Sequence, residues 1–132
     1  MNIFWFRRDL RIEDNVGLFH ALNSAEEVLP IFIFDEHILS QLPKEDARVS
    51  FIHAQLEKIQ AELNTVGKSL AVFHGKPIEV FEKLITENKI SAVYTNHDYE
   101  PYARNRDKEL NQLFVSKEIS FLTSKDQVIF EK

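Results

Sequence analysis

Short apolar runs alternate with amphipathic stretches along the whole chain. The apolar runs are rich in β-branched and aromatic residues, which favours β-strands. We expect five strands, over residues 2–7, 28–34, 69–74, 91–96 and 119–122, and helices between them over 14–23, 45–66, 77–88 and 100–116. Strands and helices in alternation are typical of βαβ units around a parallel sheet. The pattern therefore predicts one doubly wound α/β domain over residues 1–132.

The predicted strands are continuously hydrophobic rather than alternating, which indicates burial on both faces. This favours a three-layer, Rossmann-like arrangement of a five-stranded parallel sheet between two layers of helices. Such sheets bind ligands at the carboxyl ends of their strands, near the point where the strand order reverses. We therefore expect the walls of a site in the loops over residues 7–15, 34–42 and 96–106.

The helix over residues 45–66 has the best-determined pattern. Its apolar residues step by four, three, four and three positions, which lays one stripe against the sheet. The stripe consists of Ile52, Leu56, Ile59, Leu63 and Val66, with Glu57, Lys58, Gln60 and Glu62 expected to point away. Gly67 is expected to cap its C-terminus, Asp14 to cap the N-terminus of the first helix, and Pro77 to begin the third.

Composition narrows the class of protein. A chain of 132 residues with 44% hydrophobic content can bury the core of one domain, and no stretch approaches the length of a membrane span. The N-terminus has the pattern of neither a secretory signal nor a transit peptide, so we expect a soluble, cytoplasmic protein. The net charge of -5 argues against binding nucleic acid unaided, because phosphate neutralisation dominates such binding.

Several kinds of site are excluded by the residues present. The three glycines, Gly17, Gly67 and Gly75, form neither a dinucleotide fingerprint nor a phosphate loop. The chain has no cysteine, and its five histidines lack metal-ligand spacing, so we expect no metal site. No serine has the context of a nucleophile elbow, and we expect no catalytic residue in this chain.

Two charged segments remain as candidates. The first follows the first strand, where Arg7, Arg8 and Arg11 outnumber Asp9. The second, over residues 96–107, combines acids, amides and aromatics around a predicted helix start. One interpretation is structural, with acids at the helix N-terminus and arginines that are solvated or ion-paired. In the other, the two segments face each other and form the polar rim of a ligand site or domain interface.

The same residues resemble a known family. The stretches WFRRDLR with DN, FDEHIL, ARVSF and NHDYEPYARNRD occur in the order found in the N-terminal domain of DNA photolyases and cryptochromes, and the resemblance runs from residue 3 to about residue 130. It implies an α/β domain that carries a light-harvesting antenna chromophore in many members. It also implies a second, helical domain with flavin adenine dinucleotide (FAD), which this chain lacks, so that the chain is a fragment.

By this resemblance the parent is a deoxyribodipyrimidine photo-lyase that repairs ultraviolet-induced pyrimidine dimers with blue light. The alternative parent is a cryptochrome, in which this domain is a docking scaffold. The implied partners are the helical domain and, through the parent, damaged DNA. A dimer of the isolated fragment is a further expectation, because truncation would expose an apolar surface.

The resemblance also supplies candidate antenna contacts. They are Asp9, Phe34, Asp35, Arg48, Asp98 and Glu100, together with Arg11, for which ligand contact and ion pairing both stay open. Members that bind methenyltetrahydrofolate hold it through an Asn-Glu pair where this chain has Tyr102 and Ala103. A deazaflavin or flavin is therefore favoured over folate, and an empty antenna site is the remaining alternative.

Overall fold

The computed structural model describes residues 1–7, 15–23, 26–35, 47–65, 67–96 and 101–124, without the side chains of residues 16, 47–50, 101 and 102. Five parallel strands form one sheet in the order β3-β2-β1-β4-β5. The strands are β1 (Asn2–Phe6), β2 (Val28–Asp35), β3 (Ala71–Gly75), β4 (Ala92–Asn96) and β5 (Ser120–Ser124). The predicted α/β class and the parallel sheet are confirmed, and the strand order reverses between β1 and β4.

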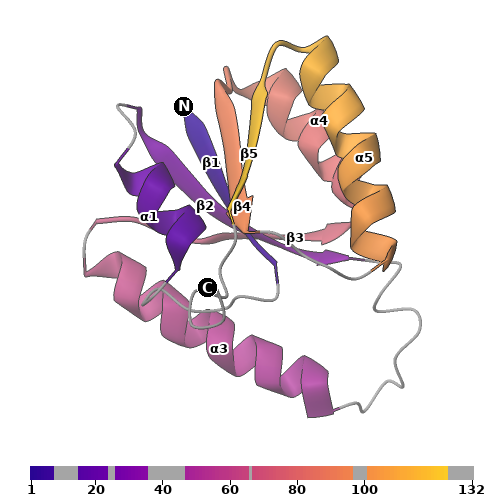
Figure 1. Cartoon of the computed structure of the whole chain (residues 1–132). Helices are drawn as coiled ribbons and strands as arrows, with labels where there is room; N and C mark the ends of the chain where they lie inside the picture. The colour runs from indigo at the N-terminus through magenta and orange to yellow at the C-terminus, as the bar shows by residue number, and fades with distance from the viewer. Residues whose placement is uncertain (8–14, 24–25, 36–46, 66, 97–100, 125–132) are drawn as a thin grey trace, which may run out of the picture.

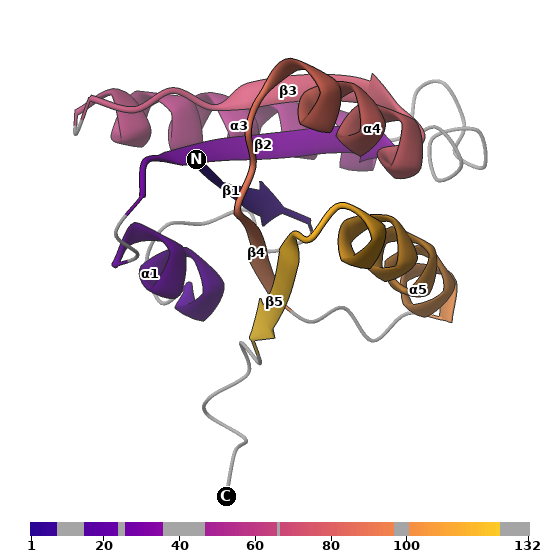
Figure 2. The same cartoon turned by 90° about the horizontal axis from the view of Figure 1, so that it is seen from above.

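The helices cover both faces of the sheet. They are α1 (Val16–Leu22), α3 (Ala47–Asn64), α4 (Pro77–Glu87) and α5 (Pro101–Ser116). Figure 1 shows α1 and α3 on one face and α4 and α5 on the other, and in Figure 2 α4 and α5 lie side by side. In the part of the chain that the structure describes, no helix combines the length and apolar character needed to cross a membrane.

Alternation along the central strands divides the core into two layers. On β1, Ile3 and Trp5 pack toward α4 and α5, while Phe4 and Phe6 pack toward α1 and α3. All of β1 is buried, because β2 and β4 pair with its two edges and helices cover both of its faces. Continuous hydrophobicity therefore correctly predicted burial on both faces of this strand.

The edge strands depart from that prediction. In β3 partly buried and exposed positions alternate, and β5 has no fully buried residue. Val72 of β3 and Leu122 of β5 are 42% and 43% exposed. Each edge strand pairs with one neighbour only, and the helix layers cover it incompletely, so an apolar sequence there does not guarantee burial.

The long helix α3 follows the predicted stripe. Leu56, Ile59 and Leu63 are buried, and Ile52 packs beside them, whereas residue 66 lies outside the described residues. The helix ends in a Schellman motif, since Lys68 N–H donates to Leu63 O and Gly67 has a φ of +77°. The expected glycine cap is confirmed.

Two details of the helices were predicted wrongly. The N-cap of α1 is Asn15, whose side chain accepts a hydrogen bond from Leu18 N–H, and not Asp14. Gln60 does not point away into solvent, because its side chain exchanges two hydrogen bonds with the backbone of Leu70. The expectation for Pro77 is confirmed, since this residue begins α4.

Candidate functional site at the carboxyl edge of the sheet

Polar side chains gather where three neighbouring strands end. Arg7 directly follows β1, Asp35 ends β2, and Thr95 and Asn96 end β4. The strands are parallel, so these residues meet at one edge of an otherwise apolar sheet. All four are buried. Polar residues that are buried together in this way need mutual hydrogen bonds, because an unsatisfied polar group in the interior is costly.

Arg7 links β1 to β4 and to α5. Its Nε donates to Thr95 Oγ1 at 2.9 Å and its Nη1 donates to Asp107 Oδ2 at 2.7 Å. Thr95 Oγ1 in turn donates to the carbonyl oxygen of Trp5 at 2.8 Å. The Arg7 side chain is only 3% exposed, so this ion pair is shielded from solvent. It therefore fixes the start of α5 against the carboxyl end of the sheet.

Arg106 makes the corresponding link to β2. Its Nη1 donates to Asp35 Oδ2 at 3.3 Å, and its Nε lies 3.8 Å from Asp107 Oδ1. We call Arg7, Asp35, Arg106 and Asp107 the carboxyl-edge ion cluster. Two guanidinium groups balance two carboxylates, so the cluster carries no net charge.

The ring of Trp5 lies beneath both arginines. The guanidinium carbon of Arg7 is 4.5 Å from the ring centroid and that of Arg106 is 4.8 Å away. Cation–π contacts of this kind are worth about 2 kcal/mol when they are desolvated. Trp5 is also packed edge-on against Phe81, so it joins the cluster to the hydrophobic core. Trp5 is therefore a core residue, in agreement with the expected burial of the first strand on both faces.

A second set of contacts holds α1 at the same edge. Asn96 Nδ2 donates to Asn15 Oδ1 at 2.6 Å, and Asn96 Oδ1 accepts from Gly17 N–H at 2.7 Å. A Cβ atom at Gly17 would lie 2.7 Å from Asn96 Oδ1 and 3.0 Å from the ring of Phe4. Only glycine allows α1 to approach the end of β4 this closely.

The structure describes part of the predicted set of antenna contacts. Asp9, Arg11, Asp98 and Glu100 lie outside the described residues, and Arg48 is the second residue of α3, with its side chain outside them. Phe34 and Asp35 are both described, at the end of β2. These seven assignments therefore remain predictions.

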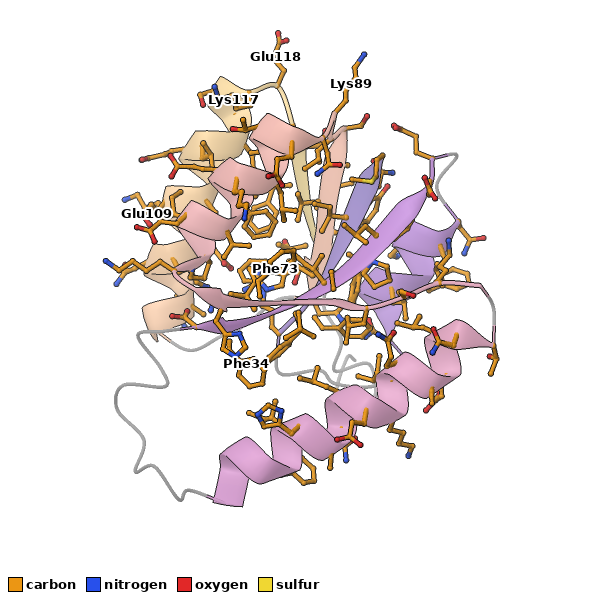
Figure 3. The ribbon with its side chains drawn as sticks, turned by 180° about the vertical axis from the view of Figure 1, so that it is seen from behind. Phe34, Phe73, Lys89, Glu109, Lys117 and Glu118 are labelled. Atoms are coloured by element: carbon orange, nitrogen blue, oxygen red, sulfur yellow. The ribbon has the colours of Figure 1, made fainter. Side chains whose placement is uncertain are left out.

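The two described candidates have clear structural roles. Asp35 binds Arg106 within the ion cluster. Phe34 is 3% exposed and lies between the sheet and α3 in Figure 3. Its ring contacts the imidazoles of His53 and His74. Both residues therefore line the carboxyl edge of the sheet.

Of the two structural alternatives for the arginines, ion pairing is confirmed for Arg7 and Arg106, and solvation is wrong for them. Both side chains are buried and ion-paired, while Arg104 on the same helix is exposed. Sequence reasoning also missed Thr95 and the Asn15–Asn96 contact. The available signal was the polar ending of an apolar strand, Thr95-Asn96, directly at the predicted ligand edge.

Metal chemistry has no support in the described part of the chain, where no three His, Asp or Glu side chains are grouped to hold an ion. The carboxyl edge carries carboxylates, amides and guanidinium groups instead, which in the described residues are hydrogen-bonded to one another. The chain is therefore a doubly wound α/β domain with a buried polar cluster at the carboxyl ends of its central strands, beside the topological switch point at which such sheets bind ligands.

The chain belongs to the DNA photolyase family, whose family model matches residues 2–132. This finding confirms the resemblance in the sequence. Among curated proteins, a deoxyribodipyrimidine photo-lyase of Synechococcus sp. strain PCC 6301 is 32% identical over 127 residues, which is 96% of this chain and 26% of the relative. Cryptochrome-1 of Mus musculus is 25% identical over 129 residues, covering 98% of this chain and 21% of that protein.

A solved structure shares the fold closely. The archaeal photolyase of Sulfolobus tokodaii, described as containing two FAD molecules with the implication of a novel light-harvesting cofactor, superposes with a TM-score of 0.86 at 37% identity. The match covers 95% of this chain and 29% of the archaeal one. The chain therefore spans about a quarter of the length of these relatives.

Proposed function

We propose that this chain is the N-terminal, antenna-binding domain of a deoxyribodipyrimidine photo-lyase. The observation that carries the proposal is the match, over 95% of the chain, to the archaeal photolyase with the proposed light-harvesting cofactor. The 32% identity to a deoxyribodipyrimidine photo-lyase supports the same parent activity. That activity is the repair of pyrimidine dimers in DNA with blue light, with FAD in a helical domain beyond this chain.

The residue types that the resemblance assigns to the antenna site suit a chromophore of the flavin or deazaflavin type. These ring systems present alternating hydrogen-bond donors and acceptors, for which carboxylates, amides and guanidinium groups are suitable partners. The residues that would hold it are Asp9, Arg11, Arg48, Asp98 and Glu100, beside Phe34 and Asp35. When bound, the chromophore absorbs light and passes the excitation to FAD.

The described residues support this arrangement through their positions. Trp5 of β1 is paired with Thr95 of β4, so the segments that follow these two strands begin side by side. The first segment contains Asp9 and Arg11 and the second contains Asp98 and Glu100. The ion cluster holds β1, β2 and α5 together at this edge and would give the chromophore a rigid floor.

The first test is the absorption spectrum of the full-length parent protein, purified in the dark, with its released chromophores identified by mass. We expect FAD and a second chromophore of the flavin or deazaflavin type. FAD alone would contradict the antenna assignment, and methenyltetrahydrofolate would contradict the assigned ligand class.

Variants of the parent test the assigned residues. Asp98→Ala or Glu100→Ala should lower the ratio of antenna to FAD without changing the secondary structure. Glu109→Gln is the matched control, because Glu109 is exposed on α5, on the outer surface in Figure 3. Unchanged antenna content in both alanine variants would refute their role as contacts.

The second candidate function is a docking domain of a cryptochrome, which the 25% identity to cryptochrome-1 supports. A parent of this class would keep the fold described here but would not split pyrimidine dimers under blue light. A repair assay on the full-length protein with irradiated thymine-containing DNA separates the two functions.

The remaining partners belong to the same proposal. The helical domain and damaged DNA are partners of the parent protein, and the cytoplasm is its expected location.

We also propose that the isolated chain dimerises through apolar surface that the helical domain would cover. Sedimentation of the 132-residue chain tests this, and a monomer at all concentrations would contradict it.

A further inference from the structure

A groove of about 450 Å³ runs between α3 and β3, away from the ion cluster. It arises because Phe32 and Phe34 of β2 lie beneath α3, so α3 covers the centre of the sheet better than its edge. The alternate residues of β3 that face α3 then line the groove. The lining consists of Phe34, His53, Leu56, Glu57, Gln60, Ala61, Asn64, Leu70, Val72 and His74.

One end of the groove is formed by three aromatic rings. Phe34 and His74 are register partners on β2 and β3, and their rings are stacked at 4.8 Å with an interplanar angle of 15°. His53 of α3 lies 5.0 Å from Phe34 with an angle of 32°. Phe34 is almost fully covered, yet both imidazoles are exposed. They therefore offer ring surface to a further planar group.

The polar groups of the groove limit what that group can be. The side-chain amide of Gln60 is already engaged with the backbone of Leu70. Glu57 and Asn64, one and three turns along α3 from His53, are exposed and make no side-chain hydrogen bond to another described residue. Glu57 offers a carboxylate acceptor close to the His53 end, which suits the amino group of a heterocycle, whereas Asn64 lies about 10 Å further along the helix, too far to contact the same ring edge.

The charge of the described lining disfavours a phosphate. No lysine or arginine is among the described residues that line the groove, and Glu57 contributes a negative charge. A phosphorylated ligand would therefore be repelled, whereas a neutral heterocycle would not. The floor of Leu56, Leu70 and Val72 is apolar, as expected of a site that takes up a flat ring.

From these observations we propose that the groove between α3 and β3 binds an uncharged purine nucleoside, stacked on His74 or His53 and hydrogen-bonded through its amino group to Glu57. This proposal does not require the proposed antenna function. The site lies between α3 and the edge strand β3, and Phe34 is the residue of its lining that is also among the predicted antenna contacts.

The test is a titration of the ¹⁵N-labelled 132-residue chain with adenosine, followed by nuclear magnetic resonance. We expect saturable shifts confined to the groove at ligand concentrations up to about 10 mM, the range for a Kd near 1 mM. Adenosine monophosphate is the counter-probe and should bind more weakly. The absence of saturable shifts in the groove, or tighter binding of the monophosphate, would overturn the proposal.

Variants separate stacking from hydrogen bonding. His74→Ala should weaken adenosine binding about fivefold or more, as expected for loss of a stacking partner. His20→Ala is the matched control, since His20 is exposed on α1 outside the groove. Glu57→Gln should weaken adenosine binding and narrow the difference from the monophosphate, whereas Glu62→Gln on the same helix should change neither.

A blocking variant completes the test. Val72→Tyr places a bulky aromatic side chain in the groove at a position that is already 42% exposed, so the fold should tolerate it. Adenosine shifts should then be lost while the dispersion of the spectrum is kept. Binding that survives both Val72→Tyr and His74→Ala would locate the nucleoside elsewhere and refute the site.

Discussion

Single residues at the carboxyl edge illustrate what a sequence can and cannot reveal. The surplus of arginines after β1 was visible as a charged segment. Ion pairing of these arginines was also foreseen as one alternative, but which acid Arg7 would bind was not, because Arg7 and Asp107 lie 100 positions apart and meet only when β1 and β4 are neighbours. Nor could spacing distinguish buried Arg106 from exposed Arg104. Partners of this kind follow from strand order, which local patterns do not encode.

The ion cluster makes a prediction at the residue scale. Arg106→Gln removes a buried partner of Asp35, and breaking such a pair costs about 3–5 kcal/mol. Urea unfolding of the chain should show a lower midpoint with an unchanged slope. Arg104→Gln changes an exposed residue on the same helix. Its free energy of unfolding should stay within about 0.5 kcal/mol of that of the unsubstituted chain. Equal effects of the two substitutions would refute a buried role for Arg106.

Gly17 makes a second prediction. Alanine normally stabilises a helix relative to glycine by about 1 kcal/mol. Here the added Cβ would meet Asn96 Oδ1 at 2.7 Å, and the Asn96 side chain is held by two hydrogen bonds. We therefore expect Gly17→Ala to destabilise the chain by about 1–3 kcal/mol, measured by urea titration. A gain in stability would mean that α1 can move away from β4 freely.

At the scale of elements, the sequence predicted all the described strands and helices to within a few residues. Two of its errors share one cause. Burial on both faces holds for β1, which has two strand partners, and fails for β3, which has one. Gln60 was misplaced for the same reason, because its partner is the backbone leading into that edge strand. Local hydrophobicity does not report whether a strand is central or at an edge.

The stripe of α3 gives a prediction at this scale. Leu56 is 6% exposed under the helix, so Leu56→Ala should cost about 2–5 kcal/mol through the cavity it leaves. Phe51 on the same helix is 63% exposed, and Phe51→Ala should have little effect. Chemical unfolding of both variants makes the comparison. Similar losses would contradict the orientation of α3.

The amino end of the sheet gives a prediction about pH. The Met1 ammonium donates to Glu26 Oε1 at 2.6 Å, and Ser91 Oγ donates to the same oxygen, which lowers the pKa of Glu26 below its ordinary value of 4.5. A lowered folded pKa stabilises the fold above the unfolded pKa, and this contribution is lost as the pH falls through the folded pKa.

Glu26→Gln should therefore be less stable than the unsubstituted chain at neutral pH. The difference in stability between the two should close as the pH falls below about 4.5. Thermal unfolding over a series of pH values measures it. Glu27→Gln, a neighbouring exposed carboxylate, is the control for the change in net charge. A gap that is independent of pH would contradict the assigned ion pair.

At the scale of the whole molecule, the fold and the family could be predicted from the sequence. Whether this chain contains every group of the candidate site could not. The described residues form two buried ion pairs at the carboxyl edge. The proposed function assigns repair to FAD in the helical domain of the parent protein, so we expect the isolated chain to leave pyrimidine dimers intact under blue light. Repair by the chain alone, in an assay that the full-length parent passes, would refute its role as an accessory domain.

The position of Trp5 has a practical consequence. It is the only tryptophan in the chain, and its ring lies directly under the carboxyl-edge ion cluster. Its emission therefore comes from one known place, next to the edge where a coloured ligand would bind. Energy transfer from Trp5 to such a ligand would quench that emission in proportion to occupancy. The intrinsic fluorescence of the protein would therefore report whether a ligand occupies this edge.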